Sequence, residues 1–166
     1  MPSRETTAAA EAAITSRRSI RAYLPTPVSR EEVGHILDVA AREQQRVAAL
    51  YRYELMDTPA EPEFDEVAQL AADICGVPMA IINLVADDCQ FFKAEIGMGV
   101  RTMPVETSFC AEAVRAGDDL FIIEDAAADA RFAHYPQVKN LPNVRFYAGA
   151  LLKTRDGHAI GSLSVM

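Results

Sequence analysis

Hydrophobic and polar residues follow two different rhythms along this chain, and each rhythm predicts its own kind of element. Near the C-terminus, two apolar segments within residues 146–165 flank Arg155-Asp156-Gly157-His158. Asp-Gly between strand-like segments signals a tight turn, because glycine adopts the positive φ that such turns need. We therefore predict an antiparallel hairpin there. Its two strands contain Gly149 and Gly161, which indicate bulges or the close approach of another backbone or a ligand.

Helical periodicity dominates the region before residue 56. Ser29 and Glu32 have the spacing of a capping box, which starts a helix. From there, residues recur at alternating steps of four and three, which predicts a helix to about Leu55 with one continuous seam. The seam residues are Val33, Leu37, Ala40, Gln44, Val47 and Tyr51. The seam can pair with a second helix or pack on its own domain, and the pattern leaves both readings open.

The rest of the chain predicts strands and short helices. In order, they are a helix at 62–75, a strand at 77–85, a strand at 90–96, an irregular loop at 100–107, a helix at 109–116, a strand at 120–124 and helical turns within 125–143. Gly76 is expected to end the first of these helices, and Ser108 to cap the second. Hairpins at both ends with helices between them imply an α+β fold, a central antiparallel sheet flanked by helices. We expect the turn-rich segment between Phe109 and Tyr147 to cover one face of the sheet. Because such a cover packs less completely than regular helices, it predicts a pocket beneath it.

Charge, cysteine spacing and the length of apolar runs limit the binding partners and the cellular location that we expect for this chain. The 166 residues carry a formal net charge of −8, which argues against nucleic acid and against an anionic membrane, since both attract lysine and arginine. Cys75, Cys89 and Cys110 lack the spacing of a zinc site or a disulfide framework. No apolar run approaches the ~20 residues of a membrane span, and the N-terminus lacks the apolar core of a signal peptide. We expect a cytoplasmic protein.

Short motifs recur in a fixed order from residue 57 onward. They are Asp57-Thr58-Pro59 with Glu63-Phe64-Asp65, Ile74-Cys75-Gly76-Val77-Pro78, Phe92-Lys93, Gly97, Ser108-Phe109-Cys110-Ala111, Asp125-Ala126, Asp129, Arg131-Phe132, Arg145-Phe146-Tyr147-Ala148-Gly149-Ala150, Asp156-Gly157-His158 and Gly161. Together they resemble a bacterial GAF domain, a small-molecule-sensing or dimerising module of signalling proteins, over residues 42–166. The resemblance implies a GAF/PAS-like fold, with helices on one side of the sheet that mediate dimers and a ligand chamber under the opposite cover.

Carried over residue by residue, the GAF resemblance assigns six residues to the ligand chamber: Phe92, Phe109, Cys110, Asp125, Phe146 and Tyr147. It assigns no catalytic residue and no metal ligand, and it leaves the cofactor unknown. GAF domains usually continue into a long connecting helix, which we expect to be missing here, because the sequence stops at Met166.

A second resemblance covers residues 12–41, which we treat as a separate helical extension spanning 1–41. Ser16-Arg17-Arg18-Ser19-Ile20-Arg21-Ala22-Tyr23, Pro27-Val28 and Glu31-Glu32-Val33, with the apolar pairs that follow, are similar to the N-terminal helices of flavin-dependent nitroreductases. In that family the Arg-Arg-Ser stretch contacts the phosphate of the flavin, because guanidinium groups match phosphate oxygens. The other flavin-binding segments of that family are absent after Ala41, so we do not expect flavin binding.

Two groups of side chains offer chemistry. Cys110 lies at the start of a predicted helix, whose dipole lowers a thiol pKa, yet a buried free cysteine also serves as a small apolar residue. Asp125, Asp129 and Arg131 can bind a polar ligand or can simply cap and pair within their loop. In the ligand reading, Lys93 and Arg145 add positive charge for an anionic group.

Three hypotheses follow. The first is a non-enzymatic sensory or regulatory GAF module that forms a homodimer through its helices and can bind a small molecule. The second is a small thiol enzyme of the GAF fold, such as a methionine sulfoxide reductase that uses Cys110. The third is an FMN-dependent, nitroreductase-like oxidoreductase that uses Arg17 and Arg18.

Overall fold

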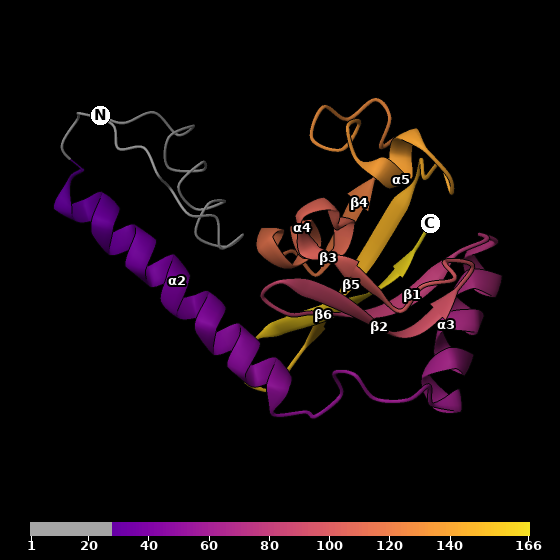
Figure 1. Ribbon diagram of the computed structural model, residues 1–166, viewed down its shortest axis with the longest axis horizontal. Helices are drawn as coiled ribbons and strands as arrows, with labels where there is room; N and C mark the ends of the chain where they lie inside the picture. Colours follow the sequence, from indigo (N-terminus) through magenta and orange to yellow (C-terminus); the bar gives the residue numbers. More distant parts are fainter. Residues whose placement is uncertain (1–27) are drawn as a thin grey trace.

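A six-stranded antiparallel sheet forms the centre of the domain (Figure 1). A computed structural model describes residues 28–166. The strand order is β3-β2-β1-β6-β5-β4, with β1 (Ala80–Val85), β2 (Cys89–Ile96), β3 (Thr102–Pro104), β4 (Leu120–Ile123), β5 (Tyr147–Lys153) and β6 (Ala159–Val165). Helices α2 (Arg30–Tyr51) and α3 (Pro62–Cys75) pack on one face, and α4 (Phe109–Ala116) packs on the other. The predicted α+β fold is confirmed.

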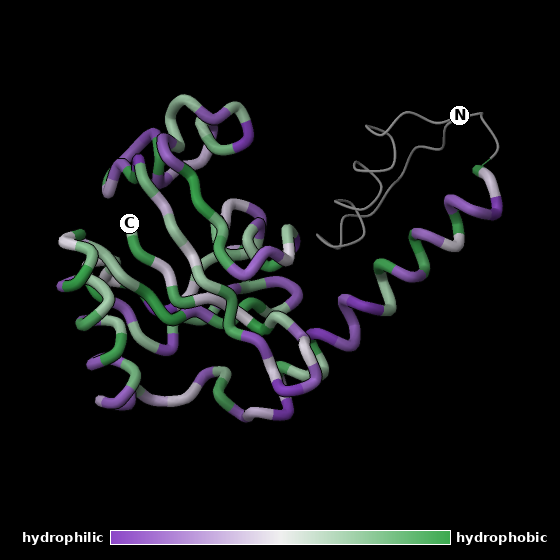
Figure 2. The backbone as a smooth tube through the Cα atoms, turned by 180° about the vertical axis from the view of Figure 1, so that it is seen from behind, coloured by the Kyte–Doolittle hydropathy of each residue, from purple (hydrophilic) through white to green (hydrophobic). Residues whose placement is uncertain are grey.

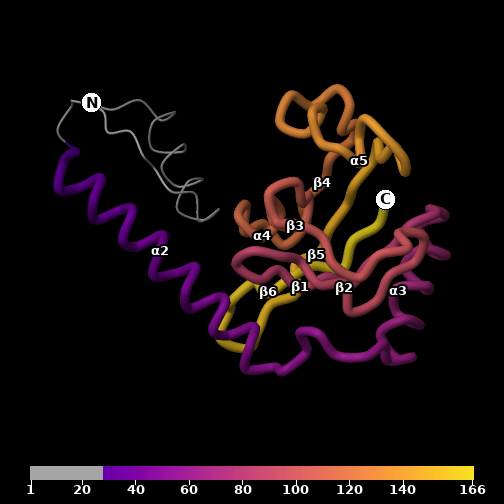
Figure 3. Tube along the Cα trace, in the orientation of Figure 1, coloured from indigo at the N-terminus to yellow at the C-terminus, as the bar shows by residue number. Residues whose placement is uncertain are grey.

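Helix α2 begins with the predicted capping box. The Ser29 hydroxyl accepts from the Glu32 amide at 3.1 Å, and a Glu32 carboxylate oxygen accepts from the Ser29 amide at 2.8 Å. The buried residues of α2 are Arg46, Ala49 and Leu50, all in its C-terminal half. The N-terminal half extends away from the sheet (Figure 3). The helix ends at Tyr51, earlier than predicted.

Helix α2 is fastened to the centre of the sheet by a buried arginine. Arg46 donates from Nη1 to the carbonyl oxygen of Val85 at 2.7 Å and more distantly to that of Ala159. Its Nε and Nη2 donate to the two oxygens of Glu43 at 2.8 and 2.6 Å, a bidentate pair on the same helix. The guanidinium therefore keeps its charge compensated while it satisfies strand-end carbonyls.

Helices α3 and α4 start and stop where the sequence indicates. Gly76 follows α3 with φ 64°, the left-handed conformation that ends many helices. The Ser108 hydroxyl accepts from the Ala111 amide at 3.0 Å and caps α4. One prediction was wrong: residues 100–107 are not an irregular loop. They contain β3 and a 3-10 turn at Val105–Thr107, because this segment pairs with β2 at the sheet edge.

Both predicted hairpins are present. The closing hairpin joins β5 to β6 through a turn in which the Gly157 amide donates to the carbonyl oxygen of Thr154 at 2.9 Å, with Gly157 at φ 87°. Gly161 lies on β6 between β1 and β5. A Cβ there would lie 1.9 Å from the carbonyl oxygen of Asn83, so this glycine permits close approach of another backbone, as predicted.

The hairpin of β1 and β2 contains a bulge at Lys93, after which Ala94 lies on the same face of the sheet as Lys93. Ile82 opposes Ala94, whereas Asn83 opposes Phe92, so Lys93 is the extra residue. Bulges re-aim neighbouring side chains. Phe92 packs on the face covered by α4, and Lys93 reaches residues of the α2–α3 linker on the opposite face.

Apolar residues concentrate along the strands, and α2 alternates between apolar and polar positions (Figure 2). Within residues 28–166, no helix has both the length and the apolarity that a membrane span requires.

Candidate functional site

The candidate ligand chamber lies between the sheet and its cover. Strands β1, β2, β5 and β6 form the floor, and α4 with residues 124–146, including α5 (Pro136–Lys139), forms the cover (Figure 1). The most extensive buried apolar cluster of the described residues occupies this layer. The layer is the place where the sequence predicts a pocket.

Aromatic rings fill most of the chamber. The ring of Phe109 lies 5.4 Å from those of Phe132 and Tyr147 and 5.5 Å from that of Tyr135, measured between centroids. Phe132 and Tyr135 come from the cover, and both are buried. Edge-on and stacked contacts of this kind stabilise a closed aromatic core. The chamber is therefore largely closed in this structure.

A small cavity remains beside this aromatic cluster. Its volume is about 20 Å³, which accommodates one water molecule. The residues that line it are Ile81, Gln90, Phe92, Met98, Met103, Ser108, Phe109, Cys110, Gln137, Val144, Tyr147 and Met166. No side chain in this lining carries a formal charge at neutral pH.

A chain of buried hydrogen bonds runs along the chamber floor. Ser162 Oγ donates to Asn83 Oδ1 at 2.8 Å, because the amide oxygen can only accept. Since a hydroxyl has one hydrogen, Ser164 must be the donor in its 2.8 Å bond to Ser162. Tyr147 at 3.0 Å and the Cys110 thiol at 3.7 Å must then donate to Ser164. The chain therefore has one direction and requires a protonated thiol.

The chain continues on the far side of Asn83. Asn83 Nδ2 donates to Gln90 Oε1 at 3.1 Å, and the Ser108 hydroxyl donates to the same oxygen at 2.7 Å. Gln90 is 3% exposed, and its Nε2 makes no hydrogen bond to any other described residue. This amide nitrogen is therefore an unused donor in a residue that lines the cavity.

Gln137 lines the same cavity and contains an unused acceptor. Its Nε2 donates to the carbonyl oxygen of Thr107 at 2.5 Å. Its Oε1 is buried, and among the described residues no group donates to it. A buried polar atom without a partner is rare, because it forfeits its hydration.

Burial determines the protonation of Cys110 and Tyr147. Burial raises the pKa of the Cys110 thiol, although hydrogen bonding with Tyr147, Ser162 and Ser164 opposes this. Burial, followed by the proximity of Cys110, raises the pKa of Tyr147 well above its ordinary value. The pKa of Cys110 is raised even though the residue lies in the first turn of α4, so the site favours the thiol over the nucleophilic thiolate.

Four of the six predicted chamber residues line the cavity, namely Phe92, Phe109, Cys110 and Tyr147. Asp125 and Phe146 do not. Phe146 precedes Tyr147 at the start of β5, where successive side chains point to opposite faces, and it is 40% exposed. Asp125 Oδ1 accepts from the Ala127 amide at 2.9 Å and holds its own turn.

The other charged residues considered for ligand binding have structural partners. Asp129 forms a bidentate pair with Arg131, whose guanidinium also lies 4.7 Å from the centroid of Phe132. Arg145 donates to the carbonyl oxygens of Val138 and Val144. These contacts match the capping and pairing alternative.

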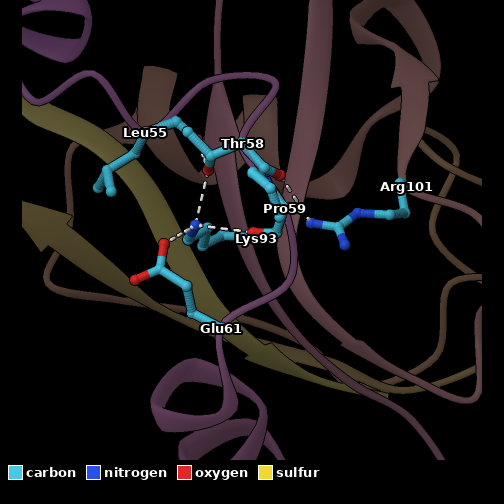
Figure 4. Close-up of polar contacts among 6 residues, drawn as sticks. All are labelled: Leu55, Thr58, Pro59, Glu61, Lys93 and Arg101. Atoms are coloured by element: carbon cyan, nitrogen blue, oxygen red, sulfur yellow. Dashed lines mark hydrogen bonds and ion pairs between the residues drawn. The ribbon is translucent and has the colours of Figure 1, made fainter.

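Lys93 does not add positive charge to the chamber, contrary to one of our readings of the sequence. It follows Phe92 on β2 and therefore points to the opposite face of the sheet, where its side chain is 0% exposed. Lys93 Nζ donates to Thr58 Oγ1 at 2.6 Å, to the carbonyl oxygen of Pro59 at 3.2 Å and to Glu61 Oε1 (Figure 4). We call these four residues the Lys93 clamp. It ties the linker between α2 and α3 to β2.

Further contacts fix the clamped linker. Thr58 Oγ1 also donates to the carbonyl oxygen of Leu55 at 2.8 Å, and Arg101 Nη2 reaches the carbonyl oxygen of Thr58 at 3.4 Å (Figure 4). The Lys93 ammonium lies 5.1 Å from the ring centroid of Phe64 on α3. The three hydrogens of the ammonium match its three acceptors, so a fully buried charge is tolerated.

Sequence reasoning missed Gln90, Ser108 and Gln137 as cavity residues. The sequence predicts Ser108 only as a helix cap, and in the structure its hydroxyl also donates to Gln90 beside the cavity. The sequence contained a weak signal for Gln90, a polar residue at the start of an apolar strand. Gln137 had none, because a glutamine in a turn-rich cover is ordinarily solvated. In residues 28–166, no three His, Cys, Asp or Glu side chains gather as metal ligands.

Comparison with known proteins decides the family. The family model described as GAF domain matches residues 59–166, more than half of the chain. The chain belongs to the GAF domain family. A model of the nitroreductase family matches residues 14–73, so it overlaps the GAF match at 59–73. The third hypothesis depends on Arg17 and Arg18 in the nitroreductase-like segment, and both lie outside the residues that the structure describes.

This GAF domain is also similar to individual proteins. It is 37% identical over 124 residues to a cyclic di-GMP phosphodiesterase of Pseudomonas aeruginosa. The aligned region makes up 75% of this chain but 21% of that protein. Most of the phosphodiesterase thus lies outside the match.

Solved structures share the fold. A GAF domain from a phosphoenolpyruvate-protein phosphotransferase of Coxiella burnetii has a TM-score of 0.51 at 12% identity, covering 75% of this chain and 77% of that one. Free methionine-R-sulfoxide reductase from Neisseria meningitidis, in complex with its substrate, has a TM-score of 0.50 at 15% identity. That match covers 88% of this chain and 80% of the reductase chain. At such identities the likeness establishes the fold alone.

Proposed function

We propose that this GAF domain is a non-enzymatic regulatory module that forms a homodimer through α2 and senses a small molecule in its chamber. The observation that carries the proposal is the uncovered seam of α2. Val33 is 45% exposed, Leu37 63% and Tyr51 51%, although they repeat on one side of the helix. A helix that exposes a regular apolar seam gains free energy when a second helix covers it.

The seam is distinct from the surface by which α2 packs on its own domain. That surface consists of Arg46, Ala49 and Leu50. At 100° per residue, Leu37 and Tyr51 lie on roughly the opposite side of the helix from Arg46. One face of α2 thus holds the domain, and the other is available to the same helix of a second copy.

The geometry at Cys110 favours regulation over thiol chemistry. A catalytic thiol needs access and a lowered pKa, whereas Cys110 is 3% exposed and its pKa is raised by burial. Cys89 packs against the apolar cluster on the opposite face of the sheet, away from Cys110. The similarity to a cyclic di-GMP phosphodiesterase supports a place in signalling, with the phosphodiesterase activity assigned to that relative only.

A charge in the α2 seam should weaken the dimer. We expect the wild-type chain to sediment as a dimer and Leu37→Glu to shift the dissociation constant by at least roughly tenfold, because a carboxylate would be buried without a partner. Analytical ultracentrifugation over a concentration series measures this shift. Gln45→Glu, which adds the same charge to an exposed position outside the seam, is the matched control. A monomeric wild type, or equal effects of both variants, would refute dimerisation through the seam.

The thiols should differ sharply in reactivity. With a thiol reagent under native conditions, we expect exposed Cys75 to react quickly and Cys110 to stay unmodified until the chain unfolds, because Cys110 is buried and protonated. Mass spectrometry of the peptides during a labelling time course distinguishes the two sites. Cys110→Ser should leave any reduction of free methionine sulfoxide unchanged. Rapid labelling of Cys110, or a turnover that Cys110→Ser abolishes, would favour the thiol enzyme instead.

A further inference from the structure

The cavity in the chamber has a defined hydrogen-bonding character as well as a position. Gln90 Nε2 is a donor without a partner, and Gln137 Oε1 is a buried acceptor without a partner among residues 28–166. Both residues line the same cavity. An occupant with one donor and one acceptor would satisfy both at once.

The rest of the floor cannot supply those partners. Each hydroxyl hydrogen of Ser108, Ser162 and Ser164 is already committed along the directed chain. Tyr147 also donates its hydroxyl hydrogen to Ser164, so it has no hydrogen left for Gln137. The two glutamines therefore remain the groups that an occupant must satisfy.

The lining also selects against charge. No formally charged side chain borders the cavity, and the arginines of the cover are paired elsewhere with Glu112, with Asp129 or with backbone carbonyls. An anionic phosphate or carboxylate would lose its hydration and could not donate a hydrogen bond to Gln137 Oε1. A neutral molecule avoids both penalties.

We propose that the cavity is a binding site for small neutral molecules that donate a hydrogen bond to Gln137 Oε1 and accept one from Gln90 Nε2, such as primary amides. The inference rests on the proposed sensory function and specifies the ligand class. It excludes nucleotides, amino acids and other charged metabolites from this site. At rest the cavity is the size of one water molecule. A larger ligand enters by displacing Met98 and Met103, whose flexible thioether chains re-pack readily.

Acetamide and acetate form a matched pair for the test, since they have the same shape and differ in charge and in the amide donor. The probe measurement is the NMR spectrum of the methionine methyl groups during titration of the full chain. We expect acetamide to shift the methyl signals of Met98 and Met103 with a saturable dependence, and a dissociation constant on the order of millimolar for so small a ligand. Met56, which packs on the opposite face of the sheet, should not respond.

Substitution of the acceptor locates the binding. Gln137→Leu keeps the side chain's bulk and should weaken acetamide binding roughly tenfold, because the amide donor loses its partner. Gln69→Leu, on the exposed surface of α3, should leave binding unchanged. The comparison of acetamide with acetate on the wild-type chain decides the charge question even if Gln137→Leu fails to fold.

Three results would overturn the proposal: equal shifts with acetate, binding that survives Gln137→Leu in a folded chain, or no saturable response to acetamide. Sedimentation of the same samples separates this inference from the dimer proposal. An intact dimer without acetamide binding rejects the ligand class and leaves a dimerising module. Acetamide binding by a monomer supports the ligand class and rejects dimerisation.

Discussion

Replacing Lys93 by alanine should destabilise the domain by about 3 kcal/mol. The substitution removes a fully buried side chain and leaves Thr58, Pro59 and Glu61 without their common donor. Large-to-small changes in a core cost about 2–5 kcal/mol, and buried acceptors without a donor add to this. The partial exposure of Glu61, 47% of its side chain, keeps the total below that of a completely buried pair.

A graded series separates the charge of Lys93 from its bulk. Lys93→Met keeps most of the buried aliphatic bulk and loses the three hydrogen bonds, so we expect a smaller cost, about 1–2 kcal/mol. Lys139→Ala, at an exposed lysine of α5, should change stability by less than about 0.5 kcal/mol. Urea unfolding followed by far-UV circular dichroism measures these values, since the chain has no tryptophan. A cost below about 1 kcal/mol for Lys93→Ala would show that the clamp contributes little.

Loss of the Lys93 clamp should also have a local effect on the linker between α2 and α3. With Lys93→Ala, the linker 52–61 should become the first site of proteolytic cleavage, because its anchor to β2 is gone. In this variant Arg101 would still contact Thr58, but through a long hydrogen bond of 3.4 Å to its carbonyl oxygen. Unchanged cleavage kinetics in this linker would indicate that α2 and α3 hold it without Lys93.

The sequence predicted the features of this fold that depend on local chemistry. The capping box at Ser29, the cap at Ser108 and the left-handed Gly76 are set by residues within one turn of each other, and all three are confirmed. The two hairpins were predictable for the same reason, since their turns lie between contiguous apolar strands. The family resemblance then supplied a central antiparallel sheet with helices on one side and a cover on the other.

The interpretation that placed Lys93 in the chamber overlooked strand alternation. Successive side chains of a strand point to opposite faces, so Lys93, which follows Phe92, points away from the chamber. The sequence could not predict the bulge at Lys93, which depends on how β2 pairs with β1 and leaves Ala94 on the same face as Lys93. The same alternation separates Phe146 from Tyr147, so a motif that names both residues cannot place both in the chamber.

The content of the chamber was likewise not predictable from the sequence. Its closure depends on Phe132 and Tyr135, which reach Phe109 from a cover with little regular structure. Its hydrogen-bonding character depends on Gln90 and Gln137, which are far apart in the sequence and line the same cavity only in the folded state. A filled chamber favours a structural or dimerising role, and the remaining cavity is what leaves room for sensing.

Replacing Gly161 by alanine should have the largest effect of all, more than about 4 kcal/mol, which is exceptional for one methyl group. The added Cβ would lie 1.9 Å from the Asn83 carbonyl oxygen, 2.9 Å from its carbon and 3.1 Å from the Cα of Leu84. All three atoms belong to the backbone of β1, so no side-chain rotation can relieve the contact. The strands β1 and β6 would have to separate.

That separation would reach the chamber, because β1 and β6 are the two central strands of the sheet. It would pull Ser162 away from Asn83 and break the directed hydrogen-bond chain at its midpoint. We therefore expect Gly161→Ala to lose its cooperative thermal transition by circular dichroism. Gly34→Ala is the matched control, since a Cβ there meets nothing within 4 Å. It should strengthen α2 by about 0.5–1 kcal/mol. A Gly161→Ala variant that melts cooperatively near the wild-type temperature would mean that β6 can shift without loss of the sheet.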